Sequence, residues 1–110
     1  MKLSRSNLDL LSILLDEIHD RYFSLDEIIY DKNALEWRLF FGESRKGPFD
    51  RILKISGVTD YICNDTEKIA IYDMNKLTVD LDKHLITLGC NVPLDIRLHI
   101  RPDFEICVER

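Results

Sequence analysis

Residues 94–109 read LDIRLHIRPDFEICVE, and this stretch decides the fold. Its apolar residues recur at every second position within two segments: Leu94, Ile96, Leu98 and Ile100, then Phe104, Ile106 and Val108. A period of two places alternate side chains on one face of a β-strand. Residues 35–41 and 77–81 alternate in the same way. The chain is therefore predicted to form a mostly antiparallel sheet with one covered face.

A helix is predicted before the sheet. Its apolar residues fall at spacings of three and four, which form one face of an α-helix: Leu8, Leu11, Leu15 and Ile18. Ser6 is placed to cap this helix, with Asp9 three residues later in a box-like position. The fold class is thus α+β, with an N-terminal amphipathic helix packed on a mostly antiparallel sheet of about six to eight strands, open or curled towards a barrel.

Turn residues divide the remainder into short strands. Tight turns are predicted at three places: Asp31-Lys32-Asn33, Asn64-Asp65-Thr66 and Asp82-Lys83. The longest loop spans residues 42–48, and Gly57 indicates a bulge or a tight bend. Strands are expected at residues 23–30, 35–41, 49–55, 68–73, 76–81 and 84–90, whereas residues 58–63 are ambiguous.

Residues 1–110 are predicted to form a single α+β domain, because the chain has no repeat, low-complexity tract or linker. The predicted core combines residues of the helix and of the sheet: Leu11, Leu15, Ile18, Trp37, Leu39, Leu77, Val79, Leu81, Ile96, Leu98 and Ile106.

The two halves of the opening stretch are expected to pair as a hairpin, with a loop of about three residues around Pro102-Asp103. On its outer face this ribbon would set Arg97, His99 and Arg101 against acidic residues of the next strand. If the ribbon lies at the edge of the sheet, its charges could be self-complementary in a homodimer. Alternatively, they keep the edge soluble and the protein monomeric.

Composition and charge exclude several classes. The formal net charge is −5 and the pI is about 5.1, and the sequence lacks the basic stripe that nucleic-acid binding requires. No apolar stretch approaches the roughly 20 residues that span a bilayer. The three cysteines, Cys63, Cys90 and Cys107, lack disulfide or zinc spacing, which favours a reducing, cytoplasmic compartment. We expect no cofactor and no metal site.

Few residues suggest chemistry. His19-Asp20 could orient a general base or a metal ligand, but a histidine at a helix end also has an ordinary structural explanation. Phe40 lies on the opposite strand face from Trp37; if exposed it could anchor a partner, and packing is the favoured alternative. The serines and cysteines lack nucleophile motifs. The candidate binding residues are therefore few: His19, Asp20, Phe40, Arg97, His99 and Arg101.

The order of a helix, His19-Asp20, a strand, a turn, a strand and then Leu53-Lys54-Ile55-Ser56-Gly57-Val58 resembles small bacterial α+β domains. Some of these domains are classed with polymorphic-toxin immunity proteins. The resemblance covers less than half of the chain, and it implies a fold rather than particular binding residues.

Two functional hypotheses follow. The first is a non-catalytic protein-binding module, in one form an immunity-type inhibitor that recognises a basic partner protein through an acidic surface. The alternative is a small enzyme or ligand-binding domain with a pocket between helix and sheet. A deep cleft that holds His19 or His99 beside a carboxylate would favour the alternative, and a filled helix–sheet interface would count against it.

Overall fold

The structure is a computed structural model that describes residues 2–65, 68–90 and 94–109. Its elements follow in chain order: β1 (Lys2–Ser4), a 3-10 helix (Arg5–Leu10), α1 (Leu11–Ile18), β2 (Tyr22–Phe23), a second 3-10 helix (Leu25–Glu27), β3 (Ile28–Asp31), β4 (Glu36–Phe41), β5 (Arg51–Asp65), β6 (Tyr72–Asp80), β7 (Leu85–Cys90) and β8 (Leu94–Glu109). One α-helix and eight antiparallel strands confirm the α+β prediction at this level, in the described part of the chain.

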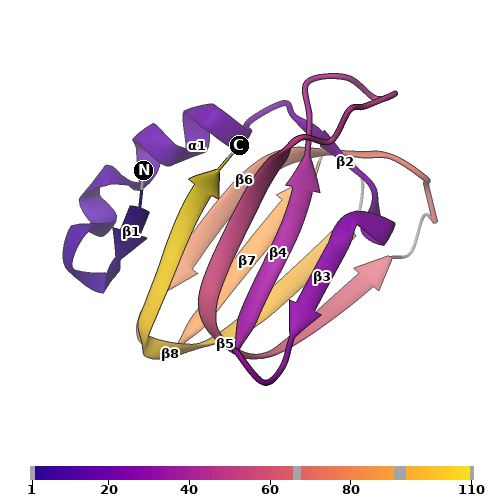
Figure 1. Ribbon diagram of the computed structural model, residues 1–110. Coiled ribbons are helices and arrows are strands. Elements are labelled where there is room, and N and C mark those ends of the chain that lie inside the picture. The colour runs from indigo at the N-terminus through magenta and orange to yellow at the C-terminus, as the bar shows by residue number, and fades with distance from the viewer. Residues whose placement is uncertain (1, 66–67, 91–93, 110) are drawn as a thin grey trace.

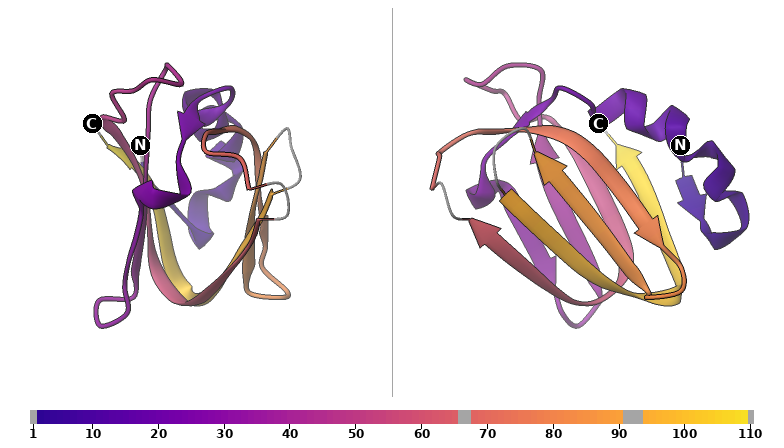
Figure 2. Two further views of the ribbon diagram at one scale, coloured as in Figure 1. Left: turned by 90° about the vertical axis from the view of Figure 1, so that its right-hand side faces the viewer. Right: turned by 180° about the vertical axis from the view of Figure 1, so that it is seen from behind.

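The strands form one sheet that is folded over into two layers (Figure 1). The sheet order is β2-β6-β7-β8-β5-β4-β3. β1 pairs with the second half of β8, on the side of β8 that faces away from β5. Figure 2 shows the two layers meeting along a bend and diverging from it, with α1 lying across the opening between them. The sheet is not closed into a barrel.

Both long strands, β5 and β8, run through the bend and belong to both layers. In the first layer, residues 52–56 of β5 pair with residues 105–109 of β8, and in the second layer residues 58–65 pair with residues 94–100. The predicted C-terminal hairpin is therefore wrong. Residues 94–100 and 104–108 are two halves of one bent strand, and they pair with β5 instead of with each other.

The bend has a local cause in both strands. Between two matched pairs, Ser56–Glu105 and Val58–Ile100, β5 has only Gly57 whereas β8 has residues 101–104. Gly57 has φ +80°, and a Cβ on it would lie 3.1 Å from the Cα of Phe104. On the β8 side Pro102 lies where the ladder is interrupted, and this placement suits a residue without an N–H donor. Gly57 thus confirms the predicted bend.

The core fills the space between the two layers. Its fully buried side chains come from α1 and from every strand except β3: Leu3, Leu14, Ile18, Phe23, Trp37, Leu39, Phe41, Leu53, Ile55, Val58, Tyr72, Met74, Ile86, Leu88, Ile96, Leu98, Phe104 and Ile106. Most predicted sheet residues are buried as expected, and Val79 and Leu81 are only partly buried.

The N-terminal helix differs from its prediction in phase and in its start. Leu14 and Ile18 are the buried residues of α1, whereas Leu11 and Leu15 are only partly buried. The predicted cap at Ser6 is wrong, because the first helical turn begins after Ser4, whose N–H donates to Asn7 Oδ1 at 2.6 Å. None of the described helices has the length and hydropathy needed to span a membrane.

Three strand predictions need correction. The expected strand at residues 23–30 is interrupted by the 3-10 helix, so that β2 and β3 lie in different layers. The expected strand at 49–55 and the ambiguous segment 58–63 are one strand, β5. The strand expected at 68–73 begins only at Tyr72 and continues to Asp80 as β6. Of the predicted turn at residues 64–66, Thr66 lies outside the described residues.

Gly57→Ala tests the bend. A Cβ at this position would contact the Phe104 backbone and the left-handed φ would be strained, so the free energy of unfolding is expected to fall by about 1–3 kcal/mol. Gly89→Ala is the matched control, because its Cβ would meet only the flexible Lys76 side chain, at 3.2 Å. Urea denaturation measures both variants. Equal losses in the two variants would contradict the role given to Gly57.

Candidate functional site

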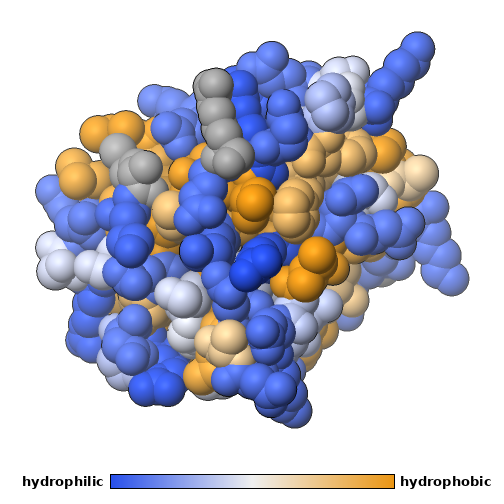
Figure 3. All heavy atoms as spheres, viewed as in Figure 1, coloured by the Kyte–Doolittle hydropathy of each residue, from blue (hydrophilic) through white to orange (hydrophobic). Residues whose placement is uncertain are grey.

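The outward face of α1 carries exposed apolar side chains among carboxylates. Ile13 is 49% exposed, and Leu10, three residues before it, is 37% exposed. Asp16 and Glu17 lie three and four residues after Ile13 and therefore flank it on the same side of the helix. Figure 3 shows apolar side chains reaching the surface over the N-terminal helix, between hydrophilic neighbours. We call Leu10, Ile13, Asp16 and Glu17 the α1 surface.

The carboxylates of the α1 surface are not neutralised by any residue that the structure describes. Asp16 and Glu17 make no ion pair or hydrogen bond with any residue that the structure describes. They lie in the second half of a helix with no basic residue in its last turn. The carbonyl end of a helix disfavours negative charge, so their placement does not help the helix itself. Both charges remain available to a partner.

A groove of about 340 Å³ adjoins the α1 surface, and it is lined by Asp16, Glu17, Arg21, Arg51, Val108 and Glu109. The two arginines are held together by one carboxylate, since Glu43 Oε1 lies 2.8 Å from Arg51 Nη2 and 4.0 Å from Arg21 Nη2. The described residues that line the groove therefore include two cations and three carboxylates, two of which come from α1.

The groove gives only partial support to a small-molecule site between helix and sheet. Its position is the one that the alternative hypothesis requires, but Val108 is the only apolar side chain among the described residues that line it. Binding sites for small molecules are mostly apolar with a few polar groups. Neither His19 nor His99 lines it. Its charged rim is better suited to polar side chains of a protein partner.

His19 and Asp20 follow α1 directly and contact each other. His19 Nδ1 lies 3.2 Å from Asp20 Oδ2, although adjacent residues seldom point at one another. The backbone turns sharply there, with φ +61° at Asp20, whose N–H donates to Met74 O. Both side chains are more than half exposed. The pair lies at the end of the α1 surface, outside any enclosed cavity that could support general-base chemistry.

Phe40 lies on the outer face of the first layer, where it is half-buried. Its directly opposed neighbour on β5 is Ile52, so that the two apolar side chains cover one another. This arrangement is ordinary cross-strand packing.

Arg97, His99 and Arg101 lie exposed on β8, on the outer side of the bent sheet. The charges that contact the arginines come from their own strand: Arg97 Nε is 2.8 Å from Asp95 Oδ2, and Arg101 Nε is 3.1 Å from Asp103 Oδ1. The predicted opposition of this cluster to acidic residues of a hairpin is wrong, because β8 does not fold back on itself. The structure therefore does not bring the six candidate residues together.

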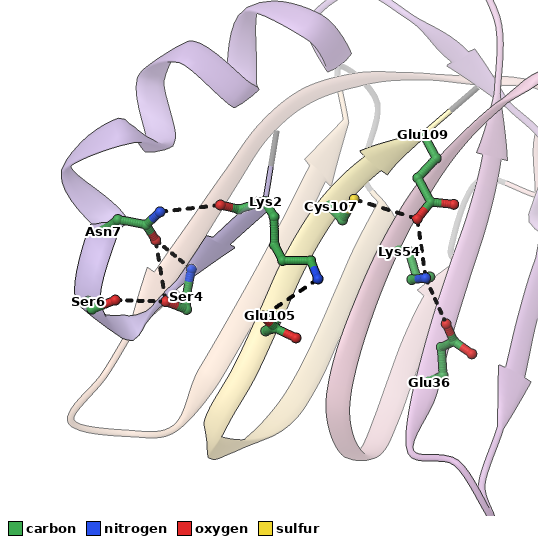
Figure 4. A network of polar contacts seen from close by, with 9 residues as sticks. All are labelled: Lys2, Ser4, Ser6, Asn7, Glu36, Lys54, Glu105, Cys107 and Glu109. Carbon is green, nitrogen blue, oxygen red and sulfur yellow. Dashed lines mark hydrogen bonds and ion pairs between the residues drawn. The ribbon is translucent and has the colours of Figure 1, made fainter.

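A charged ladder crosses the outer face of the first layer (Figure 4). Lys54 Nζ lies 3.4 Å from Glu36 Oε1 and 3.2 Å from Glu109 Oε1, while Arg38 Nη2 lies 2.9 Å from Glu36 Oε2. Lys2 Nζ approaches Glu105 Oε2 at 3.9 Å. The hydrogen bond from Arg38 lowers the pKa of Glu36, and Glu109 and Glu36 raise the pKa of Lys54. These charges compensate one another, unlike those of the α1 surface.

The cysteines are poor nucleophiles. Burial raises the pKa of the Cys90 thiol to about 12, and it also raises the pKa of Cys63 and Cys107. Nearby carboxylates act in the same direction: Asp65 on Cys63 and Glu109 on Cys107. Within the described residues, no three His, Cys, Asp or Glu side chains are placed to hold a metal ion.

Comparisons with protein-family models, curated proteins and solved structures found no match to this chain. The fold and the surface define the class instead: a small α+β module, with a bent antiparallel sheet and an exposed acidic helix.

The sequence reasoning missed Ile13 and Leu10. The signal was present, because residues 8–18 contain seven apolar side chains whereas one buried face of a short helix accommodates fewer. Some of these seven apolar side chains therefore had to be exposed to solvent. Which residues did so depended on the phase of the helix against the sheet.

Thiol reactivity tests the burial of Cys90. With a pKa of about 12, its thiolate fraction at pH 8 is about 10⁻⁴, so iodoacetamide should modify it at least about a hundredfold more slowly in the folded protein than in urea. Because the pKa is raised, the rate should keep increasing with pH above 9. Peptide mass spectrometry measures each cysteine separately. Equal rates for Cys90 in folded and unfolded protein would contradict this account.

Proposed function

We propose that this protein is a non-catalytic protein-binding module, which binds a basic partner protein through the α1 surface. One observation carries the proposal: Ile13 is exposed beside Asp16 and Glu17, which no described residue neutralises. An apolar centre with a charged rim is the usual anatomy of a protein interface. The net charge of −5 adds long-range attraction for a basic partner.

The α1 surface and the groove beside it would contact different side chains of the partner. Leu10 and Ile13 would pack against apolar side chains of the partner, and Asp16 and Glu17 would pair with its lysines or arginines. The groove beside them would receive one long basic side chain against the two carboxylates. Arg21 and Arg51 also line the groove, and their positive charges disfavour a second cation in it. The partner would therefore place only one basic side chain in the groove.

A finer form of the proposal is an immunity-type inhibitor whose partner is a toxin with a basic surface. This form is considered because the order of the chain's first elements resembles small bacterial α+β domains, some of which are classed with immunity proteins. A toxin gene directly beside the gene for this protein would favour it, and a neighbourhood without one would count against it.

A photo-crosslinking amino acid in place of Ile13 tests the proposed surface in living cells of the native host. Adducts with a specific protein are expected from position 13, and mass spectrometry identifies that protein. The same probe in place of Thr78, an exposed residue on β6, is the control and should give no such adduct. Adducts of the same protein from position 78 and not from position 13 would refute the site.

Charge reversal tests the electrostatic part of the proposal. The double variant Asp16→Lys with Glu17→Lys should weaken binding of the captured partner by at least about tenfold, because rim charges steer and orient association. Asp26→Lys with Asp82→Lys is the matched control, since it also changes the net charge from −5 to −1 but lies outside the α1 surface. Titration calorimetry at two salt concentrations measures both. Equal losses would mean that only net charge matters.

A further inference from the structure

The second half of β5 is an open strand edge. β5 pairs with β4 only through residues 51–56, and Val58 adds one backbone hydrogen bond to Leu35 O. Residues 60–65 pair with β8 on one side, Thr59 lies at a register shift, and no described strand lies on the other side of residues 59–65 (Figures 1 and 2). The other edges are residues 75–80 of β6, which β2 does not reach and which include Lys76, and the shorter strands β3 and β1, with four and three residues.

This edge has some of the features that protect strand edges from pairing, namely the charges of Asp60 and Asp65 and a register shift between Val58 and Asp60, but it lacks others. Residues 59–65 contain no lysine, proline or glycine. Ile62 lies in their middle and is 47% exposed, although it is a large aliphatic side chain. An edge of this kind is a template for another strand, since its backbone donors and acceptors are unpaired.

The edge is also held in place from the inside. The Tyr61 ring packs edge-on against Tyr30, with 5.4 Å between centroids, and against Trp37, at 6.3 Å. Tyr30 Oη donates to Val58 O at 2.7 Å and ties β3 of the first layer to the start of this edge. A strand that is already ordered loses little conformational entropy when a second strand pairs with it.

The edge is self-complementary about Ile62. In an antiparallel pair of two identical strands centred there, Ile62 faces Ile62, Asp60 faces Asn64 and Thr59 faces Asp65. Each carboxylate then lies opposite a hydrogen-bonding side chain, and no like charges face directly. A centre at Tyr61 would set Asp60 against Ile62, and a centre at Cys63 would set Ile62 against Asn64. Of the three centres, only Ile62 sets this exposed isoleucine against an apolar side chain and uses all seven residues.

We propose that a second copy of this chain pairs antiparallel with residues 59–65, with Ile62 at the two-fold axis, so that one sheet continues through both copies. A closed two-fold contact uses up the edge of each copy and stops there. A ladder of seven residues is smaller than the roughly 1,200 Å² of a standard interface, so the dimer is weak and forms at high micromolar concentration. The edge and α1 lie at opposite ends of the molecule in Figure 1, so this proposal is independent of the proposed function.

A disulfide trap tests the register. Directly opposed residues of antiparallel strands have Cα atoms about 4.5–5.5 Å apart, which suits a disulfide. Ile62→Cys should therefore form a covalent dimer under mild oxidation. Asn64→Cys is the matched control: it lies on the same face, but the two copies of this residue are four positions apart along the strand, about 13 Å. The wild type measures the background from its three cysteines.

Analytical ultracentrifugation from 10 to 500 μM tests the contact without a covalent bond, with about 500 μM as the upper limit because weak interfaces need such concentrations. Wild type should dimerise increasingly with concentration, and Ile62→Lys should stay monomeric because two lysines would meet at the axis. Ile29→Lys, on the β3 edge and equally exposed at 52%, should dimerise like wild type. Monomeric wild type at every concentration, or equal crosslinking at positions 62 and 64, would overturn the proposal.

Discussion

The close approach of β5 and β8 at their common bend is the constraint on which the rest of the structure depends. Gly57 lies against the backbone of Phe104, and this contact lets two long strands turn together from one layer into the other. The core is what the two halves enclose. Because both strands pass through the bend, each layer is anchored to the other by continuous hydrogen-bonded chain rather than by side-chain packing alone.

The bend also decides where the surfaces lie. It places β8 in the interior of the sheet, with β5 on one side and β7 or β1 on the other, so the end of the chain is not an edge. It separates β5 from β4 after Val58, because β4 stays in the first layer, and this separation leaves residues 59–65 open. The opening between the two layers is in turn the surface that α1 covers.

The charges of the molecule divide into compensated and uncompensated groups. The ladder around Lys54 on the first layer pairs nearly every charge that it contains, and surface pairs of this kind contribute little to stability. The carboxylates of the α1 surface have no such partners among the described residues. The charges on the two faces thus have different consequences, since a partner protein would have to break existing ion pairs only on the ladder.

The sequence by itself determined the elements whose signal is local. Strict alternation identified β4, the end of β6 and both halves of β8, Asp31-Lys32-Asn33 marked a turn that Asp31 Oδ1 closes, and Gly57 marked a bend. The α1 surface could be inferred only as an excess of apolar residues in the helix.

Only the tertiary structure decided how the segments join. Even-numbered apolar residues on both sides of Pro102 are equally consistent with a hairpin and with one strand bent over a core, because either arrangement turns the same face inward. Alternation indicates which face of a strand is buried, but it does not indicate which strand pairs with that strand. Pairing partners, the open edge at residues 59–65 and the phase that exposes Ile13 depend on contacts between residues far apart in the chain, which local periodicity does not encode.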